Sequence, residues 1–213
     1  MNDKIEDTLA AIERLFERAA KLKGIKTSAS KRLEPATDAK IDALAKKFDL
    51  TIPDDVRRFW RRGFDSKQLV FDDGDGASYA GFNWYAFNDL GRGLTGNRKL
   101  ATIYDAGRDE RRVLGQGFPL TVEQPQLSWD PRGGLVYFTS RKELDPPFAS
   151  SLAEFLEHWL ESGCFGSCIP SREMDSSDEE LDRWLAKVKH LVPGRIPPAK
   201  NLWLNFYKKL VGM

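Results

Sequence analysis

The sequence predicts an α+β fold: an antiparallel or mixed sheet of about five or six strands with helices mainly on one face, plus N- and C-terminal helical extensions. Apolar residues recur at helical spacing near both ends of the chain, and apolar and polar residues alternate between positions 68 and 138. Turns rich in Gly, Pro and Asp separate the alternating runs. With 213 residues, 41% of them hydrophobic, the chain has enough apolar side chains for one substantial core.

Residues 37–64 organise the predicted fold as two amphipathic helices separated at Pro53. Thr37 is positioned to cap the first helix, Pro53 is expected at the first position of the second, and Gly63 ends it. Their apolar positions are Ile41, Leu44, Ala45 and Phe48 in the first helix and Val56, Phe59 and Trp60 in the second. These faces require a sheet or further helices to cover them.

A third amphipathic helix is predicted over residues 3–22, before the central pair. Residues 23–35 are rich in Ser and Lys and are expected to be a flexible connector. The first helix is therefore expected to be an appended arm or to face a second subunit.

Six extended runs are predicted after residue 64. Residues 68–71 and 78–85 form one hairpin around an acidic turn, and residues 126–129 and 135–138 form another around a Pro/Gly turn. Residues 100–104 and 118–122 are the other two expected strands.

Three helices are predicted near the C-terminus. Ser151 and Glu154 have the spacing of a capping box before the first, and Ser177 and Glu180 before the second. Residues 201–210 form the third and are apolar on several sides. We expect this last helix to dock on its own domain or to cover a partner.

Two motifs of this chain resemble the SUKH superfamily. The first is Ile52-Pro53-Asp54-Asp55 followed by Phe59, and the second is Phe118-Pro119, a strand, Asp130-Pro131-x-Gly133-Gly134, a strand, and Ser150-Ser151-Leu152-x-x-Phe155-Leu156. That superfamily includes fungal cell-wall synthesis regulators and bacterial immunity proteins that neutralise polymorphic toxins. The resemblance implies a SUKH-like domain over 31–165, preceded by a helix and linker (1–30) and followed by a helical extension (166–213) packed on the same domain.

Gly91, Gly93 and Gly96 spell G-x-G-x-x-G, the pattern of dinucleotide-binding loops. That site requires a buried strand before the glycines and an apolar helix start after them. Asn88-Asp89-Leu90 precedes them and 97–99 is polar. A polar loop is therefore favoured over a nucleotide site.

The acidic turn at residues 72–76 has a calcium-binding loop as its alternative interpretation. A twelve-residue calcium loop requires Gly at position six and Glu at position twelve. Counted from Asp73, those positions hold Ser78 and Trp84. A tight hairpin turn is therefore favoured.

Catalytic and metal-binding patterns are absent from the sequence. Cys164 and Cys168 have the spacing of neither C-x-x-C nor a zinc knuckle, and His158 and His190 fall on separate predicted helices. We expect free or adventitiously paired thiols, no metal and no cofactor. Because G-x-S-x-G, P-loop and H-E-x-x-H motifs are also missing, the protein is expected not to be an enzyme.

A recognition surface is predicted on the first hairpin and beside the second. By alternation, Phe82 and Trp84 face the helices and leave Tyr79 and Tyr85 for a partner. The acidic turn forms a negative island, since no Lys or Arg occurs between positions 67 and 92. Core aromatics and a solvated turn are the alternative interpretations. The predicted partner-binding residues are Asp72, Asp73, Asp75, Tyr79, Tyr85 and Trp129.

The overall charge is balanced, with 33 basic and 32 acidic residues and a net charge of +1. We therefore expect neither nucleic acid nor an anionic membrane as partner. No apolar run approaches the roughly 18 residues of a membrane span, and the acidic, amphipathic N-terminus differs from a signal peptide. The expected location is the cytoplasm.

These observations predict a non-enzymatic protein-binding module, monomeric or homodimeric. The SUKH resemblance implies an immunity protein that neutralises a cognate polymorphic or contact-dependent toxin, a secreted effector of the same or a neighbouring cell. The alternative is a regulatory or scaffolding protein of the same superfamily, and an uncharacterised hydrolase is a more remote one.

Overall fold

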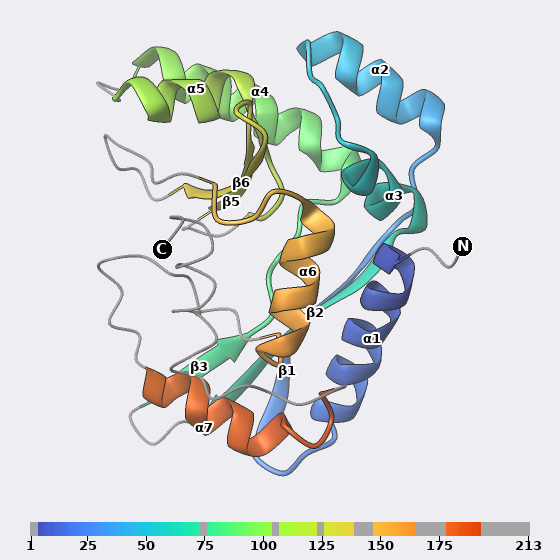
Figure 1. The fold of residues 1–213 in the computed structure, drawn as a ribbon, viewed down its shortest axis with the longest axis vertical. Coiled ribbons are helices and arrows are strands. Elements are labelled where there is room, and N and C mark those ends of the chain that lie inside the picture. The colour runs from blue at the N-terminus through green and yellow to red at the C-terminus, as the bar shows by residue number, and fades with distance from the viewer. Residues whose placement is uncertain are drawn as a thin grey trace. The chain divides into compact units, whose positions relative to one another are not determined.

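The computed structural model describes residues 4–72, 76–103, 107–122, 126–138, 147–164 and 178–192. Their elements, shown in Figure 1, are α1 (Lys4–Ala19), β1 (Ile25–Leu33), α2 (Asp38–Phe48), α3 (Asp54–Arg62), β2 (Phe64–Asp72), β3 (Ala77–Ala80), α4 (Phe87–Ile103), α5 (Arg108–Gln116), β4 (Phe118–Pro119), β5 (Gln126–Asp130), β6 (Gly134–Phe138), α6 (Leu152–Glu161) and α7 (Asp178–Val188). The predicted helix over 201–210 lies outside the described residues. None of the described helices is both long and apolar enough to cross a membrane.

The described strands form two three-stranded sheets, in the orders β1-β2-β3 and β4-β5-β6. The predicted mixture of helix and sheet is confirmed, but the prediction of a single sheet of five or six strands is wrong. The run predicted over 78–85 ends at Ala80, because Gly81 turns the backbone to φ +94°. Beyond Gly81, pairing in this run is reduced to an isolated bridge between Trp84 and Thr121.

The chain divides into two units that we describe separately. Unit 1 comprises the described parts of 1–31, 65–82 and 156–213, and unit 2 those of 32–64 and 83–155. Each unit contains one of the two sheets, apart from the end residues of β1 and β2. The predicted division at residues 30 and 165 stays a prediction.

Helix α1 is part of the core of unit 1. As expected of the predicted amphipathic helix, it buries one apolar stripe, which consists of Ile5, Leu9, Ile12, Leu15, Phe16 and Ala19. The Phe16 ring lies 5.8 Å from that of Trp159, which also lies 5.1 Å from Phe82. An ion pair of 2.6 Å joins Lys4 to Glu157. The helix is thus packed on its own unit along its whole length.

Strand β1 corrects the prediction of a flexible connector over 23–35. It forms an edge of the sheet and pairs with β2. Only its terminal residues, Ile25 and Leu33, are buried, and the seven between them are exposed. Backbone pairing rather than side-chain burial stabilises the strand, so its sequence shows no alternation.

The two central helices, α2 and α3, belong to unit 2 and begin and end nearly as predicted. The Thr37 hydroxyl accepts a hydrogen bond of 3.4 Å from the Lys40 amide, so the predicted cap is confirmed. Pro53 is the N-cap of α3 rather than its first helical residue. Gly63 ends α3 with φ +72°, and a Cβ there would approach the Leu33 carbonyl oxygen to 2.4 Å. Only glycine fits this position.

An aromatic cluster forms the core of unit 2 around α3. Phe59 contacts Trp84 at a centroid distance of 5.0 Å, and Trp60 contacts Phe87 at 5.4 Å and Phe118 at 5.9 Å. Trp84 also lies 6.4 Å from Phe155 at the start of α6. Burial of each large ring contributes about 1.5 to 3 kcal/mol.

Helices α4 and α5 were not expected. Gly91, Gly93 and Gly96 lie inside α4, so the predicted polar loop is wrong. The strand predicted over 100–104 is also wrong for residues 100–103, which are helical, and residue 104 lies outside the described residues. Gly91 lies against Leu44 and Phe48 of α2, where a Cβ would make ordinary contacts at 3.8 Å. Of the three glycines only Gly93 is closely packed, because a Cβ there would lie 3.0 Å from the Tyr85 ring, whereas one on Gly96 would meet nothing within 4 Å.

The hairpin of β5 and β6 and the start of α6 confirm their predictions. Residues 126–130 pair antiparallel with residues 134–138. The Ser151 hydroxyl accepts the Glu154 amide at 3.0 Å, while the Glu154 carboxylate accepts the Ser150 amide at 2.8 Å rather than that of Ser151. The capping residues are thus the predicted ones, but the Glu154 carboxylate bonds to the amide of Ser150 instead of that of Ser151.

Candidate functional site

The β2–β3 hairpin of unit 1 has one buried and one open face. Strand register pairs Val70 with Tyr79 and Asp72 with Ala77. Side chains alternate between the faces. The buried face consists of Leu69, Phe71, Ser78 and Ala80, and the open face of Val70, Asp72, Ala77 and Tyr79.

The buried face fixes the hairpin to the helices of unit 1. Phe71 stacks at 4.7 Å on Trp184 of α7. The Trp184 indole donates a hydrogen bond of 2.9 Å to the Gly163 carbonyl, and the Gly81 amide donates one of 3.0 Å to the Cys164 carbonyl. These contacts hold the strand that carries Tyr79 in place before any partner arrives.

The open face brings two of the predicted partner-binding residues together. Tyr79 is 48% exposed, and Asp72 is exposed at the end of β2. They are diagonal neighbours across the strand pair, at a typical Cα separation of about 7–8 Å. The face therefore offers an aromatic ring, a phenolic hydroxyl and a carboxylate to one ligand.

Strand β1 adds positive charge on the other side of β2. Lys26 and Lys31 are both exposed, as are the Thr, Ser and Ala residues between them. The sheet of unit 1 thus carries both signs of charge.

Asp73 and Asp75, also predicted to bind a partner, lie outside the described residues. Of the acidic turn, only Asp72 and Gly76 are among the described residues, and Gly76 has φ +154°. The role of the acidic turn stays a prediction.

Tyr85 and Trp129 lie in unit 2, where both are half-buried. A Cβ on Gly93 would lie 3.0 Å from the Tyr85 ring, so helix and ring are closely packed. Burial, and then the charge of Asp89, raise the pKa of the Tyr85 phenol. Trp129 stacks on Phe118 at 6.2 Å. Each ring therefore has a packing role, and its partner-binding role stays a prediction.

Of the side chains that the sequence analysis weighed for catalysis, His158 is paired, Cys164 is buried, and His190 is exposed after the end of α7. His158 lies 3.3 Å from Glu161, on the same helix. Cys164 is a free, buried cysteine, and burial raises the pKa of its thiol well above the ordinary value. A protonated thiol is a poor nucleophile and metal ligand. Cys168 lies outside the described residues, which contain no cluster of three or more His, Cys, Asp or Glu suited to a metal.

A cluster of arginines in unit 2 is missing from the sequence-based prediction. Arg108, Arg111 and Arg112 lie on α5, and Arg112 contacts the buried Asp130, as does Arg132. The signal in the sequence is the run RDERR over 108–112, which becomes one charged helix surface only once α5 is recognised.

Comparison with known proteins found no match for this chain. No family model, no curated protein and no solved structure matches it. The resemblance to the SUKH superfamily therefore rests on its two short motifs alone.

Proposed function

We propose that the protein is a non-enzymatic binding protein that holds a protein partner on the open face of the β2–β3 hairpin, and that this partner is a bacterial toxin, as the SUKH resemblance implies. The observation that carries this proposal is the 48% exposure of Tyr79 between two buried neighbours, Ser78 and Ala80. A tyrosine fixed by its strand offers a partner contact area at little further cost in entropy.

The charges around Tyr79 favour selective binding. Asp72 lies on the same face, and Asp73 and Asp75 follow it in the sequence, which suits a basic toxin surface. The lysines of β1 repel a partner that is uniformly basic. A partner with a matching pattern of charges is therefore preferred over any basic protein.

Co-expression with a toxin domain encoded by the neighbouring gene tests the proposal. The wild-type protein should restore growth and bind the purified toxin domain, and Tyr79→Ala should weaken binding about 30-fold or more, as loss of an interface hot spot does. Val122→Ala, at a position that is 43% exposed in unit 2, is the matched control and should bind like wild type. The combined Asp72→Asn/Asp73→Asn/Asp75→Asn variant should associate more slowly, most clearly at low salt.

The outcomes separate the partner from the surface. A wild-type protein that neither binds the toxin domain nor restores growth would exclude the immunity role for that pair. If wild type binds and Tyr79→Ala binds equally well, the partner surface lies elsewhere. Because Tyr79 is exposed, its replacement should leave thermal unfolding nearly unchanged, and circular dichroism verifies this.

A further inference from the structure

A buried carboxylate holds two arginines in fixed positions in unit 2. The Asp130 side chain is fully buried at the end of β5. Arg112 of α5 donates to it from Nε at 3.1 Å and from Nη2 at 3.2 Å, so both carboxylate oxygens are engaged. Arg132, in the turn after β5, donates from Nε at 2.9 Å and from its backbone amide at 2.9 Å. This two-pronged geometry orients the Arg112 guanidinium before any ligand binds.

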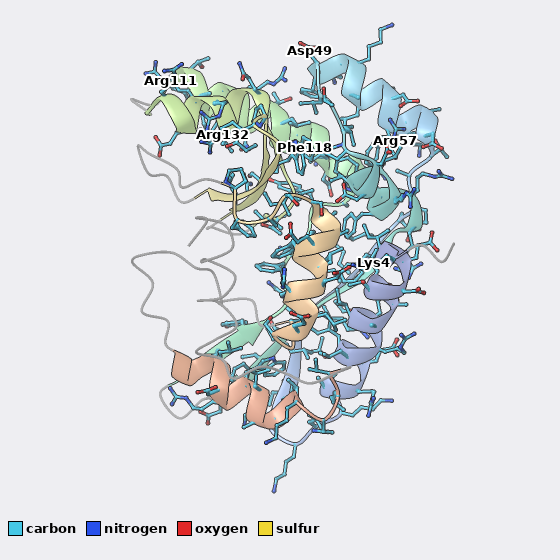
Figure 2. All side chains as sticks on the ribbon, viewed as in Figure 1. Lys4, Asp49, Arg57, Arg111, Phe118 and Arg132 are labelled. Atoms are coloured by element: carbon cyan, nitrogen blue, oxygen red, sulfur yellow. The ribbon has the colours of Figure 1, made fainter. Side chains whose placement is uncertain are left out.

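A groove of about 360 Å³ lies along the same helix. Its described lining consists of Arg108, Arg111, Arg112 and Gln116. These positions share one side of α5, since residues three and four apart are neighbours on a helix. The volume is at the lower end of the range for small-molecule sites, about 300–1,000 Å³. Figure 2 labels Arg111 on α5 and Arg132 in the turn after β5.

Positive charge exceeds negative charge around this groove. Four arginines of α5 and the β5–β6 hairpin accompany only three acidic residues, Asp109, Glu110 and Asp130. Glu110 is buried and accepts the Gly107 amide at 3.0 Å, and Asp130 is buried against Arg112 and Arg132. Arg108 and Arg111 are exposed. The described lining of the groove contains no carboxylate.

Arg108 and Arg111 lie one helical turn apart and repel each other, because like charges on one helix face are destabilising. The charge of Arg112 is compensated by Asp130. A ligand with two or more negative charges attracts both exposed arginines. Guanidinium groups match phosphate oxygens with paired hydrogen bonds, and the Gln116 amide adds neutral donors. A monocarboxylate supplies a single negative charge and so attracts the arginines less.

We infer that this groove binds the phosphate groups of a small di- or polyphosphate ligand. Arg112 is the fixed donor, and Arg108 and Arg111 close on the ligand from the exposed side. The site lies in unit 2 and goes beyond the proposed partner face of unit 1. It also differs from the G-x-G-x-x-G segment, whose glycines lie inside α4.

Calorimetric titration of the full chain with inorganic pyrophosphate tests the inference, with acetate as the monocarboxylate probe. Saturable binding of pyrophosphate is expected, with binding of acetate at least about tenfold weaker. Arg108→Ala/Arg111→Ala should weaken pyrophosphate binding about 100-fold or more, since each hydrogen bond to a charged group is worth about tenfold or more. Lys40→Ala/Lys46→Ala removes the same charge from exposed positions of α2 and should bind like wild type.

Several results would overturn the inference: no saturable binding of pyrophosphate, equal binding by the arginine double variant, or equal affinity for acetate. An equal loss in the lysine control would show that overall charge, rather than the groove, attracts the anion. If the double variant fails to fold, Arg111→Gln replaces it and should still weaken binding about tenfold or more. Tyr79→Ala should retain wild-type affinity for pyrophosphate, which separates this site from the proposed partner face.

Discussion

The sheets of the two units place most of their polar side chains in different environments, although Ser66 and Ser78 of unit 1 are buried. In unit 1, the polar residues of β1 and the Asp72 and Tyr79 side chains face solvent. In unit 2, Gln126, Ser128 and Asp130 of β5 are buried. The Gln126 amide oxygen accepts hydrogen bonds from Asn97 at 3.2 Å and from Ser128 at 3.4 Å.

This difference shows that a polar residue in a strand can have either of two roles. Exposed in unit 1, it contributes little to stability and is available to a partner. A buried polar residue of unit 2 is held by hydrogen bonds. Their loss leaves buried polar groups unsatisfied and therefore destabilises the fold. The variants that follow test this contrast.

The largest effect is expected from replacing Asp130. Asp130→Asn removes the negative charge that Arg112 and Arg132 both contact, and should lower the free energy of unfolding by about 3 kcal/mol, as breaking a buried ion pair does. Asp72→Asn, the same change on the open face of unit 1, should alter it by less than about 0.5 kcal/mol. Urea denaturation of both variants measures the difference. Equal losses would contradict the contrast between the two sheets.

The contribution of Asp130 should also depend on pH. Burial raises the pKa of this carboxyl, but hydrogen bonds and charges from Arg112 and Arg132 outweigh burial and hold the pKa below its ordinary value. The stabilisation is therefore complete above the unfolded-state pKa of about 3.9 and is lost as the pH falls through the lower folded-state pKa. The stability gap between wild type and Asp130→Asn should shrink below about pH 4. Urea denaturation over a pH series measures the gap, and a constant gap would exclude Asp130 titration as its cause.

The smallest effects on stability are expected from substitutions of two glycines of α4. One glycine packs against a neighbouring side chain and the other faces open space. A Cβ on Gly93 would lie 3.0 Å from the Tyr85 ring, whereas one on Gly96 would meet nothing within 4 Å. Gly96→Ala should stabilise the protein by about 0.5–1 kcal/mol. Gly93→Ala should destabilise it by about 1 kcal/mol, because the ring must shift. Thermal unfolding measures both, and a stabilising Gly93→Ala would show that the Tyr85 ring moves freely.

The sequence predicts those elements that bury a regular apolar stripe. Helices α1, α2, α3 and α6 and the β5–β6 hairpin belong to this group. Strand β1 was not predicted because it is stabilised by pairing with β2 and shows no alternation of apolar and polar residues. Helix α4 was not predicted because Gly91, Gly93 and Gly96 lower helix propensity locally. The single predicted sheet fails for a related reason, since the turn at Gly81 depends on a close approach to the Lys67 carbonyl.

The candidate sites divide in the same way. Alternation along 78–85 predicts that Tyr79 and Tyr85 are open and that Phe82 and Trp84 are buried. Tyr79 is exposed and Phe82 and Trp84 are buried, but Tyr85 is half-buried, because the strand ends at Ala80. The arginine groove was not predictable, because α5 was not expected and the buried position of Asp130 appears only once β5 packs. Local patterns thus identify surface residues within one hairpin, whereas a site assembled from a helix and a distant strand requires the fold.

The long exposed edge of β1 has a consequence for the protein at high concentration. An uncovered edge strand is a template on which a second chain can add a strand, the first step of aggregation. In β1, residues 27–30 are small and leave the backbone accessible, while Lys26 and Lys31 flank them. If two copies paired antiparallel through these edges, Lys26 of one would lie opposite Lys31 of the other, and like charges facing each other across strands are destabilising. The two lysines therefore oppose antiparallel pairing of two copies through this edge.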